Sequence, residues 1–132
     1  MRLFNLFENS AIERNYNFEN MVDNIKDSNC LIINTLDSNN QNCLILNTLS
    51  IDKEIELLNK YIKTNREIKI IIYGKNSYDN SVLTKYKQLK NLGFNNIYIY
   101  TGGLFEWLLL QEVYGEENFP TTTNEIDILK YK

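Results

Sequence analysis

The sequence contains no histidine, and this absence limits the chemistry that the chain can perform. Pairs of serine or cysteine with histidine are excluded, because the base that activates the nucleophile is missing. Two cysteines alone cannot complete the tetrahedral ligand set of zinc. There is neither a Walker-type glycine loop nor a pair of carboxylates in a supporting motif. We therefore expect no metal site and no cofactor.

Long apolar runs are also missing, since none approaches the roughly 20 residues needed to span a bilayer. The apolar part of the opening stretch MRLFNLFENS is too short for a signal peptide. We therefore expect Cys30 and Cys43 to be reduced thiols in a cytoplasmic protein. The 21 asparagines and 16 isoleucines are typical of an A/T-rich genome, such as that of a large DNA virus or a parasite, and a viral protein would act in the host cytoplasm.

Net charge and chain length further limit the class of protein and its possible partners. A net charge of −3 gives no electrostatic reason to expect binding to nucleic acid or to an anionic membrane. The 132 residues, 43% of them hydrophobic, suffice for one domain with a buried core. We expect residues 1–132 to form a single domain, with 116–132 as a packed extension because Ile126, Ile128 and Leu129 would otherwise lie in solvent.

Short apolar runs alternate with amphipathic segments through most of the chain. This alternation predicts an α/β fold with a five-stranded, mainly parallel sheet and helices on both faces. The expected strands lie near residue 12 and at 31–36, 44–47, 68–73 and 96–100, with 68–73 central because it is the most uniformly apolar. The expected helices are 18–25, 51–62, 80–92 and 104–114.

Details of three helices follow from their residues. Helix 51–62 should turn one face inward, made of Ile51, Ile55, Leu58 and Ile62. Helix 80–92 should end at Gly93 in a left-handed C-cap, with Phe94 as its hydrophobic contact. Helix 104–114 is apolar nearly all round, which exceeds what one buried face needs, so either the C-terminal tail or a partner should cover its second face.

The stretch GFNNIYIYTGGLFEW, which begins at Gly93, resembles the second half of a rhodanese-like domain. The resemblance rests on a Gly-Phe that ends a helix, a strand, the pair Gly102 and Gly103, and Trp107 four residues after the second glycine. It covers residues 68–107 well and the N-terminal half loosely. Independently, glycine suits a sharp turn from strand to helix, and Trp107 would anchor that helix on the sheet.

The resemblance directs attention to the loop in IIIYGKNSYDNS, residues 70–81. In active rhodaneses the corresponding loop begins with a cysteine and ends with a basic residue, and its N–H groups cradle a persulfide or an anion. Counting forward from the strand places Gly74 at the cysteine position, whereas counting back from Gly93 places Asn76 there. The basic position then falls on Asp79 or Ser81, so neither alignment supplies the expected residues. The resemblance implies that the active-site loop corresponds to these residues: Gly74, Lys75, Asn76, Ser77, Tyr78 and Asp79.

The missing thiol removes the group that would carry sulfur or phosphate. Ser77 has no base to activate it, and Asp79 at a helix start should cap the N–H groups that an anion would need. Cys30 and Cys43 should each begin an apolar strand, so we expect them to be core residues at the edge of the sheet opposite the ligand crevice. We therefore assign no catalytic residue.

Three functions remain open from the sequence. The first is a catalytically inactive rhodanese-like module that binds a protein partner or forms a homodimer through helix 104–114. The second is a sulfurtransferase or phosphatase-type enzyme with an atypical loop. The third is a small-anion binder at residues 74–81, in which Lys75 is the cation.

Overall fold

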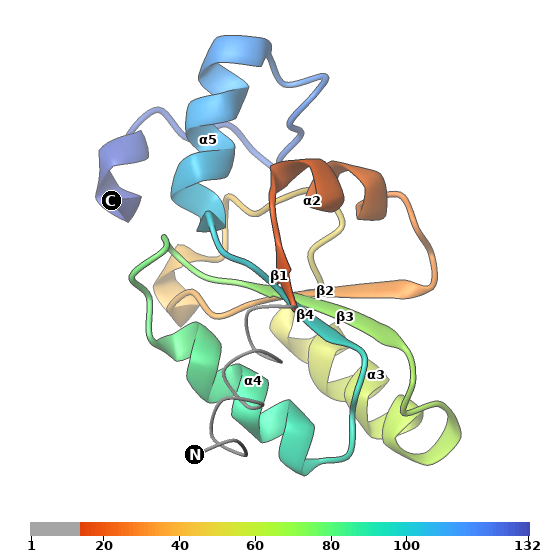
Figure 1. Cartoon of the computed structure of the whole chain (residues 1–132). Coiled ribbons are helices and arrows are strands. Elements are labelled where there is room, and N and C mark those ends of the chain that lie inside the picture. The colour runs from red at the N-terminus through yellow and green to blue at the C-terminus, as the bar shows by residue number, and fades with distance from the viewer. Residues whose placement is uncertain (1–13) are drawn as a thin grey trace, which may run out of the picture.

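The computed structural model describes residues 14–132, and these form a parallel sheet of four strands. The strands are β1 (Asn15–Tyr16), β2 (Cys30–Asn34), β3 (Lys69–Tyr73) and β4 (Ile97–Tyr100). Their order across the sheet is β1-β4-β3-β2, and each neighbouring pair is parallel (Figure 1). The prediction that residues 68–73 lie inside the sheet is confirmed, because β3 is flanked by β4 and β2.

The prediction of a strand at residues 44–47 is wrong, and the strand expected near residue 12 lies outside the described residues. Ile45 instead forms an isolated antiparallel bridge with Thr121 of the C-terminal tail. Asn47 has a φ of 71°, so the chain turns here, and the N–H of Leu49 then donates to the carbonyl of Ile32. Thr48 adds a single parallel bridge to Ile32 of β2, so the run touches the edge of the sheet but forms no strand at residues 44–47.

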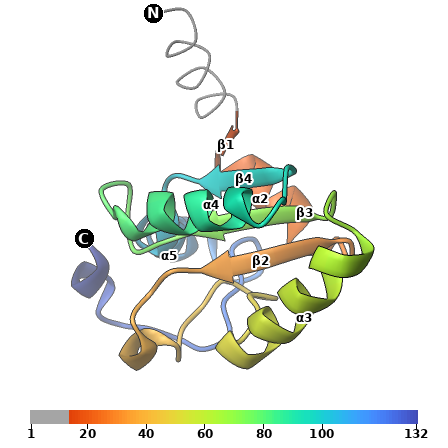
Figure 2. The ribbon, with the colours of Figure 1, turned by 90° about the horizontal axis from the view of Figure 1, so that it is seen from below.

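Two layers of helices enclose the sheet. The α-helices are α2 (Phe18–Asn24), α3 (Ile51–Thr64), α4 (Ser81–Asn91) and α5 (Gly103–Tyr114), and the short 3-10 helices are η1 (Ser38–Asn40) and η2 (Ile128–Tyr131). Helices α2 and α5 cover one face, and α3 and α4 cover the other (Figures 1 and 2). Within residues 14–132 no helix combines the length and the apolar character needed to cross a membrane.

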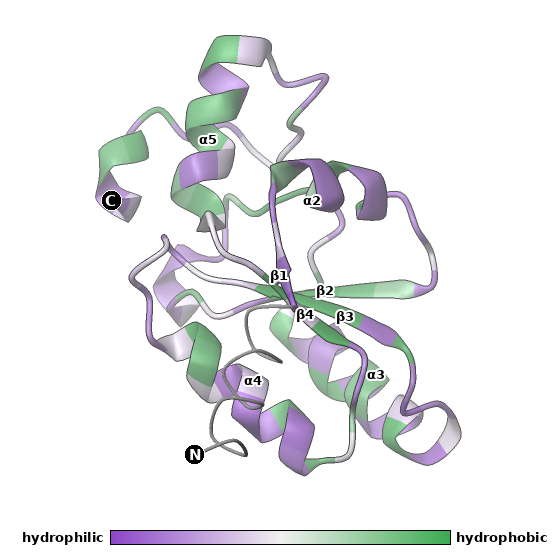
Figure 3. Cartoon of the chain, viewed as in Figure 1, coloured by the Kyte–Doolittle hydropathy of each residue, from purple (hydrophilic) through white to green (hydrophobic). Residues whose placement is uncertain are grey.

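The alternation of side chains along β3 divides the core in two. Ile71 and Tyr73 point into the core beneath α2 and α5, whereas Ile70 and Ile72 point into the core beneath α3 and α4. Figure 3 shows hydrophobic residues along most of β2 and through the middle of β3. A strand buried on both faces needs such a continuous apolar run, which explains why β3 was recognisable in the sequence.

The predicted inner face of α3 is wrong in its first half. Ile51 is exposed, and 56% of the surface of Ile55 is accessible to solvent. Glu54 turns inward instead, where its carboxylate forms an ion pair with Lys85 of α4. The second half of the helix packs as predicted through two residues, Leu58 and Ile62.

The end of α4 has the C-cap that its sequence predicts. Gly93 has a φ of 99°, in the left-handed region. The N–H of Phe94 donates to the carbonyl of Leu89, and the N–H of Gly93 donates to that of Lys90. This pair of hydrogen bonds defines a Schellman motif, and the fully buried Phe94 provides its hydrophobic contact.

The C-terminal tail packs on the domain through only one of the three residues predicted: Ile128 is partly buried against the core. Phe119 and Tyr131 are buried, whereas Ile126 is 95% exposed and Leu129 is also exposed. The carbonyl of Pro120 accepts hydrogen bonds from the indole N–H of Trp107 and from the N–H of Leu46. Aromatic anchors and backbone pairing hold the tail, so Ile126 and Leu129 can remain in solvent.

Candidate functional site

The loop of residues 74–80 connects β3 to α4 at the carboxyl end of β3. In open parallel sheets, ligands bind in the crevice outside the carboxyl ends of the strands. This loop follows an inner strand, so it occupies the position where such a fold places a ligand site.

The carboxylate of Asp79 folds back into this loop. Its Oδ2 accepts the N–H of Lys75 at 2.8 Å, and its Oδ1 accepts the N–H and the hydroxyl of Ser81 at 3.0 and 2.6 Å. Burial alone would raise the pKa of Asp79, but the donors at Lys75 and Ser81 lower it below its ordinary value. Asp79 is therefore ionised at neutral pH, and two N–H groups beside the loop, those of Lys75 and Ser81, already bind this internal carboxylate.

The start of α5 packs directly against the same loop. The N–H groups of Leu104 and Phe105 donate to the carbonyls of Gly74 and Lys75, both at 2.9 Å. Gly103 has a φ of 70°, and a Cβ at this position would lie 2.9 Å from backbone atoms of the loop. The helix and the loop can approach this closely only because residue 103 has no side chain. As a result, the loop takes up N–H groups in the first turn of α5.

The remaining loop residues divide between structural contacts and solvent. The side-chain oxygen of Asn76 accepts the N–H of Tyr78, and its amide nitrogen donates to the carbonyl of Tyr131 at 2.8 Å. Lys75, Ser77 and Tyr78 are exposed. No charged base within residues 14–132 forms a hydrogen bond with Ser77, so this serine has no partner that would activate it.

A polar pocket of about 350 Å³ opens beside the loop. The charged residues that line it are Lys75, Lys132, Asp37 and Asp79. The two lysines are balanced by the two aspartates, so the pocket offers no excess of positive charge to an anion.

Neither cysteine lies in the loop. Cys30 begins β2, and burial raises the pKa of its thiol to about 12. The prediction that Cys43 also begins a strand is wrong, because its segment pairs with the tail instead. Cys43 is buried, its thiol contacts the carbonyl of Thr123, and burial raises the pKa of this thiol as well. Both groups are therefore protonated at neutral pH and poorly nucleophilic.

Trp107 is fully buried and connects three parts of the fold. Its ring packs edge-on against Tyr100 of β4 and against Phe119 of the tail, with centroids 6.0 and 5.1 Å apart. The prediction that Trp107 anchors its helix on the sheet is confirmed by the contact with Tyr100. The contact with the tail agrees with the alternative that the tail covers a second face of this helix, but no local pattern indicated Phe119 as the residue that makes it.

Sequence reasoning also missed part of the surroundings of the loop. Lys132 lines the polar pocket, and the backbone of Tyr131 binds Asn76. These residues lie more than fifty positions beyond the loop along the chain, and no local pattern indicates that they meet it. Among residues 14–132, no three acidic or cysteine side chains gather closely enough to hold a metal ion.

Comparison with solved structures finds chains of the same architecture. The BH2092 protein from Bacillus halodurans is 16% identical, with a TM-score of 0.63 over 99% of this chain and 98% of that one. The Alr3790 protein from Anabaena sp. is 17% identical, with a TM-score of 0.59 over 87% of this chain and 86% of that one. The solution structure of the rhodanese-like domain of the Anabaena protein is 16% identical, with a TM-score of 0.56 over 85% and 88%. These likenesses establish the shared fold.

The family comparison covers most of the chain. None of the curated proteins compared with it matches. The profile of the rhodanese-like domain, however, matches residues 17–110, from the N-cap of α2 to within α5. This range contains β2, β3 and β4, the loop that holds Asp79, and the turn at Gly103. The chain therefore belongs to the rhodanese-like domain family.

Proposed function

We propose that this rhodanese-like domain is catalytically inactive and acts by binding a protein partner. The main support for inactivity is the carboxylate of Asp79, which lies inside the loop and accepts hydrogen bonds from the N–H groups of Lys75 and Ser81. Residues 74–81 contain no cysteine, so no thiolate is available there to accept a sulfane sulfur or a phosphoryl group.

Anion binding without covalent chemistry has less support. An anion at the loop would meet the ionised carboxylate of Asp79, which already occupies two N–H donors. The adjacent pocket adds Asp37 alongside Lys75 and Lys132. Repulsion by the two carboxylates offsets the attraction of the two lysines.

The binding role is supported by apolar surface on α5. The tail contacts this helix through Trp107 and through Gln111, whose side chain donates to the carbonyl of Phe119. It leaves Leu109 exposed, together with 73% of Val113 and 61% of Tyr114. Exposed apolar side chains that cluster on one helix are typical of an interaction surface. A cytoplasmic location forms part of the proposal, since Cys30 and Cys43, neither of which forms a disulfide with another described residue, would stay reduced there.

The inactivity is tested by assays of the purified protein for sulfur transfer from thiosulfate to cyanide and for hydrolysis of a phosphate ester. We expect no turnover above background. Turnover that is lost on Cys43→Ala or Ser77→Ala would contradict the proposal.

A second experiment tests the role of Asp79 directly. In a background of Cys30→Ala and Cys43→Ala, a single thiol is introduced by Asn76→Cys, with and without Asp79→Arg. Position 74 is unsuitable, because a Cβ at Gly74 would lie 2.6 Å from both Asp79 and Val82. Asp79→Arg removes the carboxylate, which frees N–H donors, and it also adds a cation. Both changes should lower the pKa of the Asn76→Cys thiol, so this thiol should be alkylated at lower pH than in the variant that keeps Asp79. Identical pH profiles for the two variants would show that Asp79 does not block the loop.

A further inference from the structure

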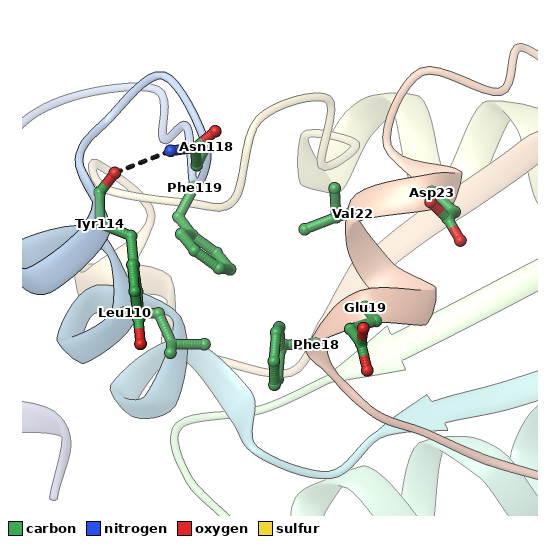
Figure 4. Close-up of a pocket in the computed structure, with 8 residues that line it drawn as sticks. All are labelled: Phe18, Glu19, Val22, Asp23, Leu110, Tyr114, Asn118 and Phe119. Atoms are coloured by element: carbon green, nitrogen blue, oxygen red, sulfur yellow. Dashed lines mark hydrogen bonds between the residues drawn. The ribbon is translucent and has the colours of Figure 1, made fainter.

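An open groove lies between α2 and α5 on the face of the sheet away from α3 and α4. It encloses about 700 Å³. Its apolar lining comes from two helices and the tail: Phe18, Val22, Leu110, Tyr114 and Phe119. Figure 4 shows these side chains lining the space between the two helices.

The aromatic floor of the groove is already assembled. The ring of Phe119 lies 5.9 Å from that of Phe18 and 6.2 Å from that of Tyr114, measured between centroids. Phe119 is itself buried, so the floor is fixed by the core beneath it. A ligand would therefore meet a formed apolar surface and would not need to create one.

The charges on the groove have one sign. Glu19 and Asp23 line it from α2, and no lysine or arginine does so among the described residues. They stand four positions apart on the same helix, and both are exposed. Within residues 14–132 neither carboxylate forms an ion pair. Like charges at this spacing repel each other, so a cation placed over them would relieve an unfavourable interaction.

These charges argue against a second copy of this chain as the occupant. A symmetric dimer through the groove would bring together Glu19 and Asp23 of both copies. The net charge of −3 adds to that repulsion. The same carboxylates would attract a basic partner.

The apolar surface also extends beyond the groove. Val113 lies one turn beyond Leu110 on α5 and is 73% exposed, and Tyr114 projects from the rim. A helical segment of a protein is long enough to cover both the groove and this neighbouring surface.

From these features we infer that the groove binds a basic amphipathic helix of a partner protein. Its apolar side chains pack on Phe18, Phe119 and Tyr114, and its lysines or arginines lie over Glu19 and Asp23. This inference rests on the proposed function, because it names the chemistry of the partner that a binding module would recognise. Helices that place an apolar face into a groove are an established mode of recognition, and complementary charge fixes their orientation.

The test uses a fluorescent synthetic amphipathic helix made of leucine and lysine, and a counterpart in which glutamate replaces every lysine. Fluorescence anisotropy with the full chain should show binding of the lysine helix and at least tenfold weaker binding of the glutamate helix. Equal binding of the two helices, or binding of neither, would overturn the inference.

Matched variants locate the binding. Glu19→Gln with Asp23→Asn should weaken binding of the lysine helix several-fold, whereas Asp52→Asn with Glu56→Gln should leave it unchanged. The control pair has the same spacing and lies on α3, across the sheet. Tyr114→Ala should abolish binding, and Leu83→Ala, an exposed residue of α4, should not. Equal losses in test and control variants would show non-specific attraction and overturn the inference.

The outcomes separate this inference from the proposed function. Absence of binding together with absence of sulfur transfer would remove the groove as the site while leaving the inactivity in place. Sulfur transfer by the unmodified chain would contradict the inactivity, whether or not the synthetic lysine helix binds. Sedimentation analysis gives the last outcome: a dimer that Tyr114→Ala dissociates would assign the groove to a second copy and overturn the inference.

Discussion

The close approach of α5 to the loop can be measured by adding a single methyl group. In Gly103→Ala the new Cβ would lie 2.9 Å from the N and Cα of Asn76 and from the carbonyl oxygen of Gly74. These are backbone atoms, so they cannot turn aside as a flexible side chain would. The substitution should force α5 and the loop apart and weaken the hydrogen bonds that Leu104 and Phe105 donate.

The size of the effect follows from two contributions. An alanine with positive φ costs about 1 kcal/mol, and inserting an atom into a packed contact costs a further 1–3 kcal/mol or so. Gly103→Ala should therefore lower the free energy of unfolding by about 2–4 kcal/mol. Gly93→Ala is the matched control: its φ is also positive, but its Cβ would meet only the side chain of Arg66, which can move. It should cost about 1 kcal/mol.

Equilibrium unfolding in urea, followed by tryptophan fluorescence, measures both variants. The midpoint for Gly103→Ala should fall by about 1–2 M relative to the wild type, and that for Gly93→Ala by less than half as much. Equal losses for the two alanines would refute the reasoning, because the backbone contact at position 103 would then contribute nothing beyond the strain of a positive φ.

Three further predictions concern the core, the loop and the thiols. Trp107→Ala should cost about 3–5 kcal/mol in urea unfolding, since it empties a fully buried site, and an unchanged midpoint would show that the indole is not packed as described. The pKa of Asp79 is lowered in the folded state, so its contribution is present above its unfolded pKa of about 3.9 and is lost as pH falls through the folded pKa. At neutral pH Asp79→Asn should therefore have a lower free energy of unfolding than the wild type, and this difference should disappear in acid. A difference that is independent of pH would contradict the assigned hydrogen bonds. Cys30 and Cys43 should react with iodoacetamide at neutral pH far more slowly in the folded protein than in urea, because burial raises the pKa of both thiols, and equal rates would contradict their burial.

The elements that were predictable from the sequence are those with local signals. β3 is a continuous β-branched run, and α4 ends at a glycine followed by an aromatic residue. Each signal lies within a few residues of the feature that it specifies. The segment at residues 44–47 misled because its composition matches that of β2, while its actual partner is Thr121 in the distant tail. Likewise, nothing near Glu54 indicates that Lys85 of another helix makes its burial tolerable.

In the candidate site, too, features with a local sequence signal were predictable, and features that depend on distant contacts were not. The position of Asp79 at a helix start indicated that it would bind N–H groups, and the structure adds the N–H of Lys75 on the opposite side of the loop. The excess of apolar residues in α5 was visible, but the groove was not, because Phe18 and Phe119 meet only when both ends of the domain are folded. Ile126 and Leu129 were expected to be buried, yet the aromatic residues Phe119 and Tyr131 take that role.

The pairing of the tail with residues 42–46 has a consequence for the order of folding. The hydrogen bonds from Leu44 to Thr122 and from Thr122 to Asn42 join positions 78 and 80 residues apart. On the ribosome, β2, β3 and β4 can pair as soon as α5 has emerged, because they need nothing beyond Tyr114. Trp107 then remains without its partner at Pro120 until the tail has been synthesised.

A nascent domain at that stage exposes an indole and an apolar segment that the tail later covers. Contacts of such long range form late, since the loop that they close is costly in entropy. Translation that pauses between Tyr114 and Pro120 should therefore leave a sheet-containing intermediate that chaperones recognise. The tail thus contributes both the cover of Trp107, through Phe119 and Pro120, and a contact with the Asp79 loop, through the carbonyl of Tyr131.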